Sequence, residues 1–464
     1  MLDSIRHIHL IGVGGIGMSG LAKMLLKLGK KVSGSDLSAN DQWRELKQLG
    51  ATMSLGHDAG HVTGADLVVY SSAIVPQNPE LQAALTHNIP TIRRAKMLGL
   101  LCRAKRSIAI TGAHGKTTTS SMLVSILDAA KLDPNFIIGG VVNHVGSNAR
   151  GSSSPLMVIE ADESDGSFID LAPQSIVITN IDAEHLDFYK SMPALKSALY
   201  KFAQLLPADG HLYLNADDAS LRELFANYPH TAVTWFGIKP HPEYTNYLQA
   251  TAVREGRPCS FVLNTTPITL QIGGTHNIYN ALAATAVALK LGVAPDIIAQ
   301  ALQHYHGVRR RSELKAVARG IYWYDDYAHH PTEVATLLSA FRAEATQRGS
   351  SLVVVFQPHR YSRFTNLYTE FLQAYAQADL LVVLPIYAAG ESNNTVRTST
   401  GFVADFNQRF GNKAHYAADL QQAFDLVMQL AQNGDLVLTT GAGDVCKLSQ
   451  FLPTTTGTEL QHAS

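Results

Sequence analysis

The sequence predicts an α/β protein of three domains whose sheets are mostly parallel. Three observations support this fold class. The chain has 464 residues, which is more than one domain usually holds. Short apolar runs alternate with longer segments of helical periodicity, the order expected of doubly wound parallel sheets. Two glycine-rich turns each join an apolar run to a helix-like segment, and 46% hydrophobic residues suffice for large cores.

The predicted N-terminal domain is Rossmann-like and covers residues 1–106. Its apolar helix face carries Met18 and three leucines at helical spacing. The expected elements, in chain order, are a strand at 7–13, a helix at 16–29, strands near Lys31–Gly34 and Leu67–Ser71, a helix ending near Cys102 and a linker at Arg103–Arg106.

The predicted central domain covers residues 107–306 and has the strand–loop–helix order of P-loop ATPases. Its expected elements are a strand at 108–110, a helix that opens at Lys116 and runs to Ala130, and buried strands at Leu156–Ala161 and Ser175–Thr179. Two stretches, 208–218 and 230–272, carry fewer helix signals, and we expect peripheral antiparallel strands there.

The predicted C-terminal domain covers residues 307–464 and is again Rossmann-like. Its expected strands are Ile321–Tyr324, Leu352–Phe356, Leu380–Leu384 and Leu436–Thr439. Helical segments between these strands make parallel pairing the expected arrangement.

The segment IAITGAHGKTTT, residues 108–119, has the order of a nucleoside triphosphate site. Backbone N–H groups of the turn point at phosphate oxygens, and the helix N-terminus adds partial positive charge. Lys116 can neutralise the β- and γ-phosphates, and the Thr117 hydroxyl can bind Mg²⁺. The loop is shorter than the usual G-x-x-x-x-G-K-[ST], since Ile110 stands where the first glycine belongs. The alternative is a glycine turn followed by a chance Lys-Thr. The sequence favours ATP or GTP binding.

Acidic side chains follow two buried strands of the central domain. Glu160, Asp162, Glu163 and Asp165 end the first strand, and Asn180, Asp182 and His185 follow the second. Because the carboxyl ends of parallel strands share one edge, both groups should face the crevice of Lys116. Oxygen ligands such as Thr117 and Glu160 suit Mg²⁺, and His185 can hold a second, bridging cation. The alternatives are a solvated acidic loop and a hydrogen-bonded core histidine.

The first domain carries Gly12-Val-Gly14-Gly15-Ile-Gly17 between a strand and a helix, with Asp36 at the end of the next strand. This is the dinucleotide fingerprint, with Asp36 on a ribose hydroxyl. Its physical basis is backbone donors plus a helix terminus, so it serves any nucleotide diphosphate. NAD, another nucleotide and a purely structural turn all remain open, and another nucleotide is favoured.

Two segments of the last domain follow strands: Asp325–Pro331 and Gln357–Arg363. The cationic side chains of His359, Arg360 and Arg363 suit a small carboxylate, and the alternative is a solvated surface. We see no acidic residue in the sequence placed beside them to receive a second ammonium group.

Two further segments admit two interpretations each. His276 and Asn277 open an alanine-rich helix and can contact an adenine edge, although capping is an equally good role for an asparagine. Arg309 belongs to the run VRRRS at the predicted domain junction. It either reaches the ATP phosphates or is part of a solvated charge run.

Composition and charge argue against several classes of protein. The net charge is −1, so there is no basic footprint for nucleic acid. No apolar stretch approaches the ~20 residues that span a bilayer, and no signal-peptide pattern precedes the first strand. Three scattered cysteines fit a reducing compartment. We therefore expect a cytoplasmic enzyme that neither binds nucleic acid nor inserts into membranes.

Seven segments in order, TGAHGKTTT, EADESDGSF, TNIDAEHLD, GGTHNIYNALAA, GVRRRSE, DDYAHHPTE and QPHRYSR, resemble the Mur ligase family, and the resemblance covers essentially the whole chain. The start GVGGIGMSG and the segment QPHRYSR resemble the branch that joins L-alanine to UDP-N-acetylmuramate. The resemblance implies a peptidoglycan-precursor ligase, working as a monomer or homodimer, in which the first domain binds the sugar nucleotide, the second ATP and the third the amino acid.

The resemblance also implies site residues. For ATP these are Gly112, Ala113, His114, Gly115, Lys116, Thr117, Thr118, His276, Asn277 and Arg309; for the UDP-sugar they are Gly14, Gly15, Ile16, Gly17, Met18, Ser35, Asp36, Ser71 and Ser72; for the amino acid they are Tyr327, His359, Arg360 and Arg363. Thr117 and Glu160 match the ligands of a first Mg²⁺ and His185 that of a second, with Mn²⁺ as a substitute. Ala113 stands where the family more often has Thr, which a loop working through backbone N–H groups should tolerate.

The expected reaction forms an acyl phosphate from the muramate carboxylate and ATP, which the amine of L-alanine then attacks. Lys116 and His185 are the catalytic residues expected in the phosphoryl transfer, and His329 or Asp326 is expected to receive the amine proton. Domain closure is expected, because water would hydrolyse an exposed acyl phosphate. Three rivals remain: a sister ligase adding a peptide or another amino acid, an NAD-dependent dehydrogenase, and a P-loop ATPase acting as a switch.

Overall fold

The computed structural model describes residues 4–229, 232–393 and 395–452. The outermost residues of the two predicted end domains, 1–3 and 453–464, and residues 230–231 of the stretch 230–272 lie outside the described residues. Packing divides the chain into two compact units. The first comprises Met1–Ala252, Val262–Ile268 and Tyr279–Tyr305, and the second comprises Val253–Phe261, Thr269–Ile278 and His306–Ser464. The three domain boundaries stay a prediction.

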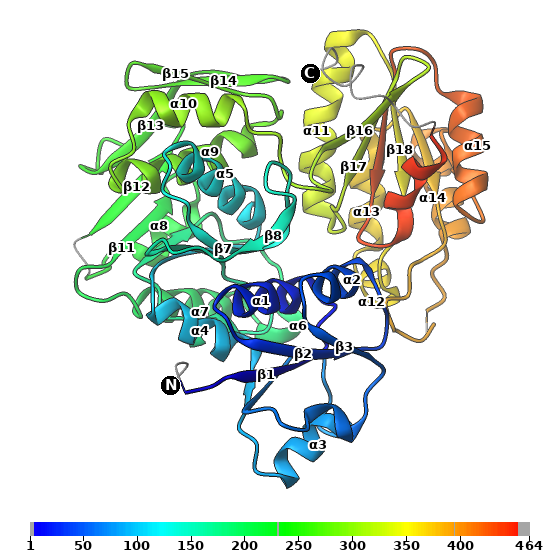
Figure 1. The fold of residues 1–464 in the computed structure, drawn as a ribbon. Coiled ribbons are helices and arrows are strands. Elements are labelled where there is room, and N and C mark those ends of the chain that lie inside the picture. The colour runs from blue at the N-terminus through cyan, green and yellow to red at the C-terminus, as the bar shows by residue number, and fades with distance from the viewer. Residues whose placement is uncertain (1–3, 230–231, 394, 453–464) are drawn as a thin grey trace. The chain divides into compact units, whose positions relative to one another are not determined.

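The first unit begins with a five-stranded parallel sheet of order β3-β2-β1-β4-β5, the order of a Rossmann half (Figure 1). Its strands are β1 (His7–Ile11), β2 (Lys31–Asp36), β3 (Thr52–Leu55), β4 (Leu67–Tyr70) and β5 (Thr91–Arg93), and its helices are α1 (Ile16–Lys27), α2 (Asp41–Gln48), α3 (Pro79–Thr86) and α4 (Arg94–Arg103). Strand β1 is wholly buried, so its apolar run made it predictable. Helix α2 buries only Leu46, and β3 has no fully buried residue, so neither gives a clear hydrophobic pattern.

The same unit contains most of a ten-stranded sheet of order β15-β14-β13-β12-β11-β10-β6-β9-β7-β8. The strands are β6 (Arg106–Thr111), β7 (Asn135–Val142), β8 (Ser147–Arg150), β9 (Leu156–Glu160), β10 (Ser175–Ile178), β11 (His211–Asn215), β12 (Val233–Gly237), β13 (Tyr247–Arg254), β14 (Cys259–Leu263) and β15 (Thr266–Leu270). The helices are α5 (Lys116–Ala129), α6 (Leu186–Tyr189), α7 (Met192–Ala203), α8 (Ala219–Phe225), α9 (Thr275–Lys290) and α10 (Pro295–Gln303).

The prediction of antiparallel strands at 208–218 and in the described part of 230–272 is wrong for β11, β12 and β13. Each pairs in parallel with its predecessor, starting from β10. Helix α8 makes the crossover between β11 and β12, and its seven residues are too few to show a helical period. Strands β7 and β8 form an antiparallel pair at the other edge of the same sheet.

The second unit contains a six-stranded sheet of order β16-β17-β21-β18-β19-β20, parallel except for β16. Its strands are β16 (Glu313–Ala318), β17 (Ile321–Asp326), β18 (Leu352–Phe356), β19 (Leu380–Val383), β20 (Ala414–Tyr416) and β21 (Leu436–Thr440), and its helices are α11 (Pro331–Arg348), α12 (Tyr361–Asn366), α13 (Tyr368–Ala374), α14 (Ser399–Phe410) and α15 (Leu420–Leu430). Helices α11 and α15 cover opposite faces of the sheet, each over its own apolar cluster (Figure 1).

Strand order fixes where functional side chains meet. In the central sheet β6 lies between β10 and β9, and all three run parallel. Their carboxyl ends, at Thr111, Glu160 and Ile178, therefore share one edge, and the segments after them lie together.

Within the described ranges no helix is both long and apolar enough to cross a membrane.

Candidate active site

The phosphate loop between β6 and α5 requires glycine at two positions. Gly112 has φ +123° and Gly115 has φ +84°, both in the left-handed region. A Cβ atom at Gly112 would collide with the Thr179 hydroxyl, and one at Gly115 would collide with the side-chain oxygen of Asn280. The loop is thus closely packed from two sides, and α5 begins directly after it at Lys116.

The loop is held by polar side chains at the end of β10. The Asn180 side chain accepts a hydrogen bond from the His114 N–H (2.9 Å) and donates one to the His114 carbonyl (3.0 Å). The Thr179 hydroxyl donates to the same carbonyl (2.6 Å). Sequence reasoning placed Asn180 at this edge without assigning it a partner, because the pairing joins residues 66 positions apart.

Lys116 is an enclosed group. Its Nζ donates to the Gly112 carbonyl (2.6 Å), the Ala113 carbonyl (3.1 Å) and the Glu163 carboxylate (2.8 Å). Its side chain is only 13% exposed. Burial alone would lower the pKa of Lys116, but the carboxylates of Glu163, Asp162 and Glu160 raise it. The ammonium therefore stays charged where phosphates are expected.

The structure brings Thr117 and Glu160 together, as the sequence led us to expect. Thr117 is among the neighbours that lower the pKa of Glu160, and the Glu160 carboxylate accepts the Gly139 N–H (2.8 Å). Burial raises the pKa of Glu160, while the Gly139 N–H and Lys116 oppose that shift. A carboxylate oxygen next to a hydroxyl, in a low-dielectric setting, is a donor set that a hard cation favours.

His185 lies near Glu163. Its Nε2 is 3.6 Å from Glu163 Oε1, and ligand atoms of Asp162, Glu163 and His185 all lie within 4.8 Å of one another. The nearby Glu163 carboxylate raises the pKa of His185 against the effect of burial. Lys116 and His185 in turn hold the pKa of Glu163 below its usual range, although burial opposes this. Glu163 thus joins the Lys116 and His185 groups, a role the sequence did not single out.

His114 contributes more than its backbone. Its Nε2 lies 2.8 Å from Asp182 Oδ2, and its Nδ1 lies 3.6 Å from Glu184 Oε1. The imidazole thereby ties the loop to the segment that leads to His185. The backbone amides of the loop remain the expected phosphate ligands.

The N-terminal glycine loop lies at the carboxyl end of β1 and leads into α1. The Gly12 N–H donates to the Ser35 carbonyl (2.9 Å), and the Gly14 N–H donates to Asp36 Oδ2 (2.9 Å). Asn40 donates to the Gly14 carbonyl (3.0 Å). Asp36 therefore holds this loop itself, which the fingerprint's ribose role does not foresee.

The predicted sugar-nucleotide residues separate into two groups. The Ser35 hydroxyl is buried and donates to Glu80 (2.5 Å), and the Met18 side chain is 2% exposed within the core. A contact of either residue with the sugar nucleotide stays a prediction. The side chain of Ser71 lies next to Gly12, and the side chains of Ile16 and Ser72 are exposed. Gly17 lies next to the Arg94 side chain, a neighbour that the sequence did not indicate.

In the second unit the end of β17 carries two buried aspartates. Asp325 pairs with Arg310 (3.0 Å) and accepts from Thr439 (2.6 Å). Asp326 accepts backbone N–H groups of Ser312 and Ala328, each at 2.7 Å. Burial raises the pKa of Asp326 to about 6, opposed by Arg311 and by those N–H groups.

The predicted amino-acid residues gather near one another. Arg363 Nη1 lies 3.4 Å from His359 Nδ1, and the rings of His329 and His359 meet edge to face at 5.9 Å. Burial lowers the pKa of both His329 and His359 to about 4. Both rings are therefore neutral at neutral pH, which corrects the expectation of a cationic His359. Two arginines contact the Tyr327 ring, Arg310 at 5.0 Å and Arg311 at 5.6 Å from the ring centre.

An acidic residue lies beside the arginines, contrary to expectation. Glu391 accepts from the Ser362 N–H (3.0 Å) and the Ser362 hydroxyl (2.7 Å), and Arg360 is among the groups lowering its pKa. Tyr387 stacks on His359 with ring planes 8° apart. Both residues come from the segment after β19, so only the fold brings them to the QPHRYSR segment.

His276, Asn277 and Arg309 have local surroundings that favour the simpler interpretations. Asn277 is buried and donates to the Gly273 carbonyl (2.7 Å), and the His276 ring lies against Gly274. Arg309 is exposed, whereas Arg310 and Arg311 contact acidic side chains. Contacts of these three residues with ATP stay predictions.

Comparisons with known proteins agree along the chain. The profile described as Mur ligase family, catalytic domain, matches residues 7–106; the Mur ligase middle domain matches 110–288; and the Mur ligase, glutamate ligase domain matches 310–443. The UDP-N-acetylmuramate–L-alanine ligase of Aquifex aeolicus is 42% identical over 449 residues, covering 96% of each chain. That of Syntrophus aciditrophicus is 41% identical over 451 residues, covering 96% of this chain and 92% of its own.

Solved structures extend the likeness to the fold. The UDP-N-acetylmuramate-alanine ligase MurC of Thermotoga maritima superimposes with a TM-score of 0.81 and 26% identity, over 99% of this chain and 100% of its own. A murein peptide ligase of Psychrobacter arcticus shares the fold with a TM-score of 0.70 at 22% identity, over 97% of this chain and 100% of its own. The sequence matches, the strand order and the phosphate loop together make this chain a member of the Mur ligase family.

Proposed function

We propose that this protein joins L-alanine to UDP-N-acetylmuramate at the expense of ATP, giving UDP-N-acetylmuramoyl-L-alanine, ADP and phosphate. The observation that carries the proposal is the enclosed Lys116, hydrogen-bonded to two carbonyls of the phosphate loop and to Glu163, in a chain 42% identical to a ligase of that name. A strand, a glycine loop and a lysine of this kind bind triphosphates. Ligation makes use of all three predicted sites, whereas a dehydrogenase would leave Lys116 and the acidic edge unexplained.

In the first step the muramate carboxylate attacks the γ-phosphorus of ATP in line, forming an acyl phosphate and releasing ADP. Lys116 is positioned by the loop carbonyls, and its charge stabilises the negative charge that develops on the phosphoryl oxygens. Glu163 also holds the Lys116 ammonium in place, through a hydrogen bond of 2.8 Å. In the second step the amine of L-alanine attacks the acyl carbon, and phosphate leaves as the amide forms.

The acidic edge fits magnesium. Thr117 and Glu160 would hold one ion, and His185 with Glu163 or Asp162 would hold a second, since these groups offer hard oxygens and one imidazole. Bound Mg²⁺, or Mn²⁺ in its place, supplies charge neutralisation on the phosphates. Glu160, with its raised pKa, is the group whose carboxylate form such an ion would stabilise most.

We propose His329, and not Asp326, as the group that receives the amine proton. Both oxygens of Asp326 accept backbone N–H groups, and its side chain is buried. His329 Nδ1 lies 3.0 Å from the Tyr327 carbonyl, which can only accept, so Nδ1 carries the proton and Nε2 keeps its lone pair. Nε2 of the neutral imidazole is thus the available proton acceptor, and it is a weak base because burial lowers the pKa of His329 to about 4.

Phosphate release from ATP tests the function directly. With UDP-N-acetylmuramate, Mg²⁺ and each amino acid in turn, we expect sustained release with L-alanine and weaker release with glycine and L-serine, because one methyl group is worth only ~1–3 kcal/mol. D-glutamate, diaminopimelate or a tripeptide outperforming L-alanine would place the chain on a sister branch. Release that needs neither acid nor amine would instead indicate an ATPase switch. Monomer or homodimer remains part of the proposal.

A further inference from the structure

The β7–β8 hairpin contacts both nucleotide-loop regions of the first unit. Helix α1, which follows the N-terminal glycine loop, packs against both strands, and Figure 1 shows α1 lying along the hairpin. A Cβ at Gly20 of α1 would lie 3.0 Å from Asn148 and 3.3 Å from Ala149, so the two elements approach closely. Helix α5, which follows the phosphate loop, also packs against β7.

On the phosphate-loop side, the hairpin touches the expected metal carboxylate. The Gly139 N–H of β7 donates to Glu160 (2.8 Å). At the other end of α5, Asp128 pairs with Arg150 of β8 (2.5 and 3.0 Å) and with His144 of the turn (3.0 Å). A shift of the hairpin would therefore be transmitted to Glu160 and to α5.

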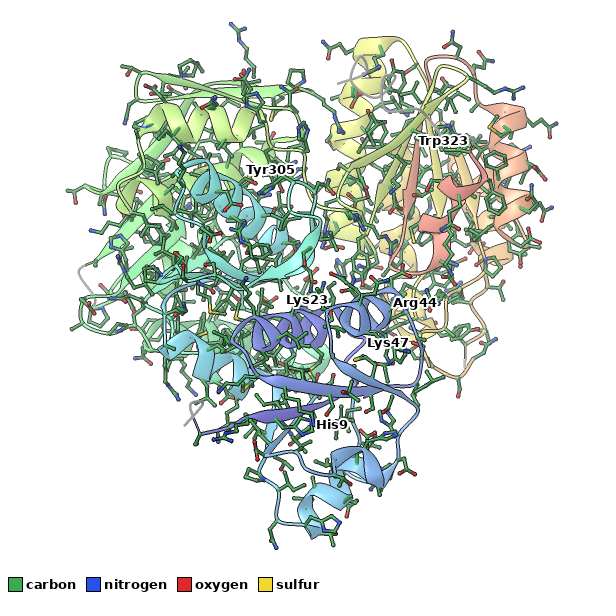
Figure 2. The ribbon with its side chains drawn as sticks, viewed as in Figure 1. His9, Lys23, Arg44, Lys47, Tyr305 and Trp323 are labelled. Atoms are coloured by element: carbon green, nitrogen blue, oxygen red, sulfur yellow. The ribbon has the colours of Figure 1, made fainter. Side chains whose placement is uncertain are left out.

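On the side of the glycine loop, the hairpin grips α1 through Lys23 and Asn148. Lys23 Nζ donates to Asn148 Oδ1 and Glu45 Oε2, both at 2.8 Å, and more weakly to Gln42 (3.2 Å) and Ser147 (3.3 Å). Its side chain is only 6% exposed, and Figure 2 labels it on α1. Burying an ammonium is costly unless it is paired, so this geometry is tightly defined.

Asn148 joins that ammonium to the first turn of α1. Its amide nitrogen donates to the Ile16 carbonyl (2.7 Å) while its oxygen accepts from Lys23, and the residue is wholly buried. Ile16 is the first residue of α1, within the Gly14–Met18 segment whose N–H groups are expected to face the sugar-nucleotide phosphates. One side chain of the hairpin thus fixes the position of that loop.

We propose that Lys23 and Asn148 are positioning residues that couple the two nucleotide loops, so that ATP on one side of the hairpin strengthens sugar-nucleotide binding on the other. The inference rests on the proposed function, which assigns a ligand to each loop. The element that changes is the β7–β8 hairpin, which is either docked on α1 and Glu160 or displaced from them. A ligand that holds Glu160 and β7 in place also holds β8, Asn148 and the start of α1. By linkage, each ligand then raises the affinity of the other by the same factor.

The experiment measures this factor by calorimetry. The dissociation constant of UDP-N-acetylmuramate is determined with and without a non-hydrolysable ATP analogue and Mg²⁺, in the full-length protein. We expect at least about fivefold tighter binding with the analogue in the unmodified protein. Asn148→Asp keeps the size of the side chain and an acceptor for Lys23 but removes the donor to Ile16, so the factor should fall to within about twofold of one. Lys23→Met should do the same.

Lys47→Met is the matched control, because Lys47 is an exposed lysine on α2 of the same region (Figure 2). It should keep the full factor, and thermal unfolding checks that every variant is folded. Affinity for the ATP analogue alone should be unchanged in Asn148→Asp, which a general structural defect would not spare. If Lys23→Met fails to fold, Asn148→Asp decides.

The proposal is overturned if the ATP analogue leaves the dissociation constant of UDP-N-acetylmuramate nearly unchanged in the unmodified protein. It is also overturned if the analogue tightens this binding in Asn148→Asp as much as in the unmodified protein. Failure of the proposed function would look different. In that case the unmodified protein would not bind UDP-N-acetylmuramate or release phosphate in response to L-alanine.

Discussion

Two loops of the first unit use the same backbone device with different side chains. At residues 12–17 and 112–115 a parallel strand ends in a glycine turn that leads into a helix. The first loop is braced by Asp36 and Asn40 and contains no lysine. The second is braced by Asn180 and Thr179 and ends in Lys116, which is paired with Glu163. Backbone N–H groups of a glycine turn are enough to bind phosphates, and of these two loops only the one expected to serve phosphoryl transfer adds a charged side chain, that of Lys116.

Removing the charge of the second loop should give the largest effect. Lys116→Ala should lower kcat at least about a hundredfold, the scale for losing one transition-state charge contact. Steady-state phosphate release measures it, with Lys131→Ala, an exposed lysine just after α5, as the control.

Because Lys116 is enclosed, stability must be separated from catalysis. Lys116→Ala leaves Glu163 buried without its ammonium, which is destabilising. The double variant Lys116→Met/Glu163→Gln removes both charges and should recover thermal stability without recovering turnover. Near-normal ligation by either variant would refute the role of Lys116.

His185 should matter for transfer more than for binding. His185→Ala should lower kcat at least about tenfold while changing the dissociation constant of ATP much less, because its cation acts as charge develops between the substrates. Pre-steady-state turnover and nucleotide titration separate the two. Equal losses in both would make His185 a structural residue.

The first loop should respond to bulk and not to charge. A Cβ at Gly15 meets only the Gly12 carbonyl, at 3.7 Å, whereas one at Gly14 would lie 2.9 Å from both Asp36 and Asn40. Gly15→Ala should therefore raise the KM of the sugar nucleotide by about tenfold without destabilising the protein, since the added methyl group only keeps the ligand from approaching the loop backbone. Gly14→Ala should also lower the melting temperature. The KM of ATP is the internal control, and tighter binding of NADH than of the sugar nucleotide would overturn the loop's assignment.

We predict that the third site recognises the carboxylate of the amino acid through side chains alone. Arg360→Lys should raise the KM of L-alanine about tenfold, because a lysine cannot form the bidentate contact with a carboxylate. The KM of ATP should change little, and Arg409→Lys, an exposed arginine on α14, should change neither. An unaltered KM for L-alanine would remove Arg360 from the site.

The smallest effect concerns histidine protonation. The pKa of His329 and of His359 is lowered to about 4 by burial, whereas that of His185 is raised by Glu163. Between those lowered values and the ordinary ~6.5, the unfolded chain binds more protons, so stability should fall as pH falls through this window, by at most about 1.4 kcal/mol per pH unit for each histidine. Asp326, with its pKa raised to about 6, acts in the opposite direction.

Denaturant unfolding at several pH values measures this slope. The difference between the unmodified protein and His359→Gln isolates one histidine from the contribution of Asp326. A slope unchanged by the substitution would show that His359 is not neutral in the folded state.

The sequence by itself determined the elements whose signals are local. Short segments rich in apolar residues predicted β1, β6, β9 and β18, and glycine turns before helices predicted both nucleotide loops, because a buried strand and a left-handed turn each need particular residues. Parallel order also placed Glu160 at the edge of Lys116. The ordered segments identified the family without any structure.

Only the tertiary structure decided which side chains meet across long separations. Glu163 with Lys116, Glu391 with Ser362, and Asn148 with Lys23 are pairs 47, 29 and 125 residues apart. The parallel pairing of β12 and β13 was likewise not predictable, since the connection before β12 holds only the seven-residue helix α8 and the one before β13 holds no helix. Burial and neighbouring charges together decided the pKa shifts of Lys116, Asp326 and His359, and no local pattern of residues encodes either cause.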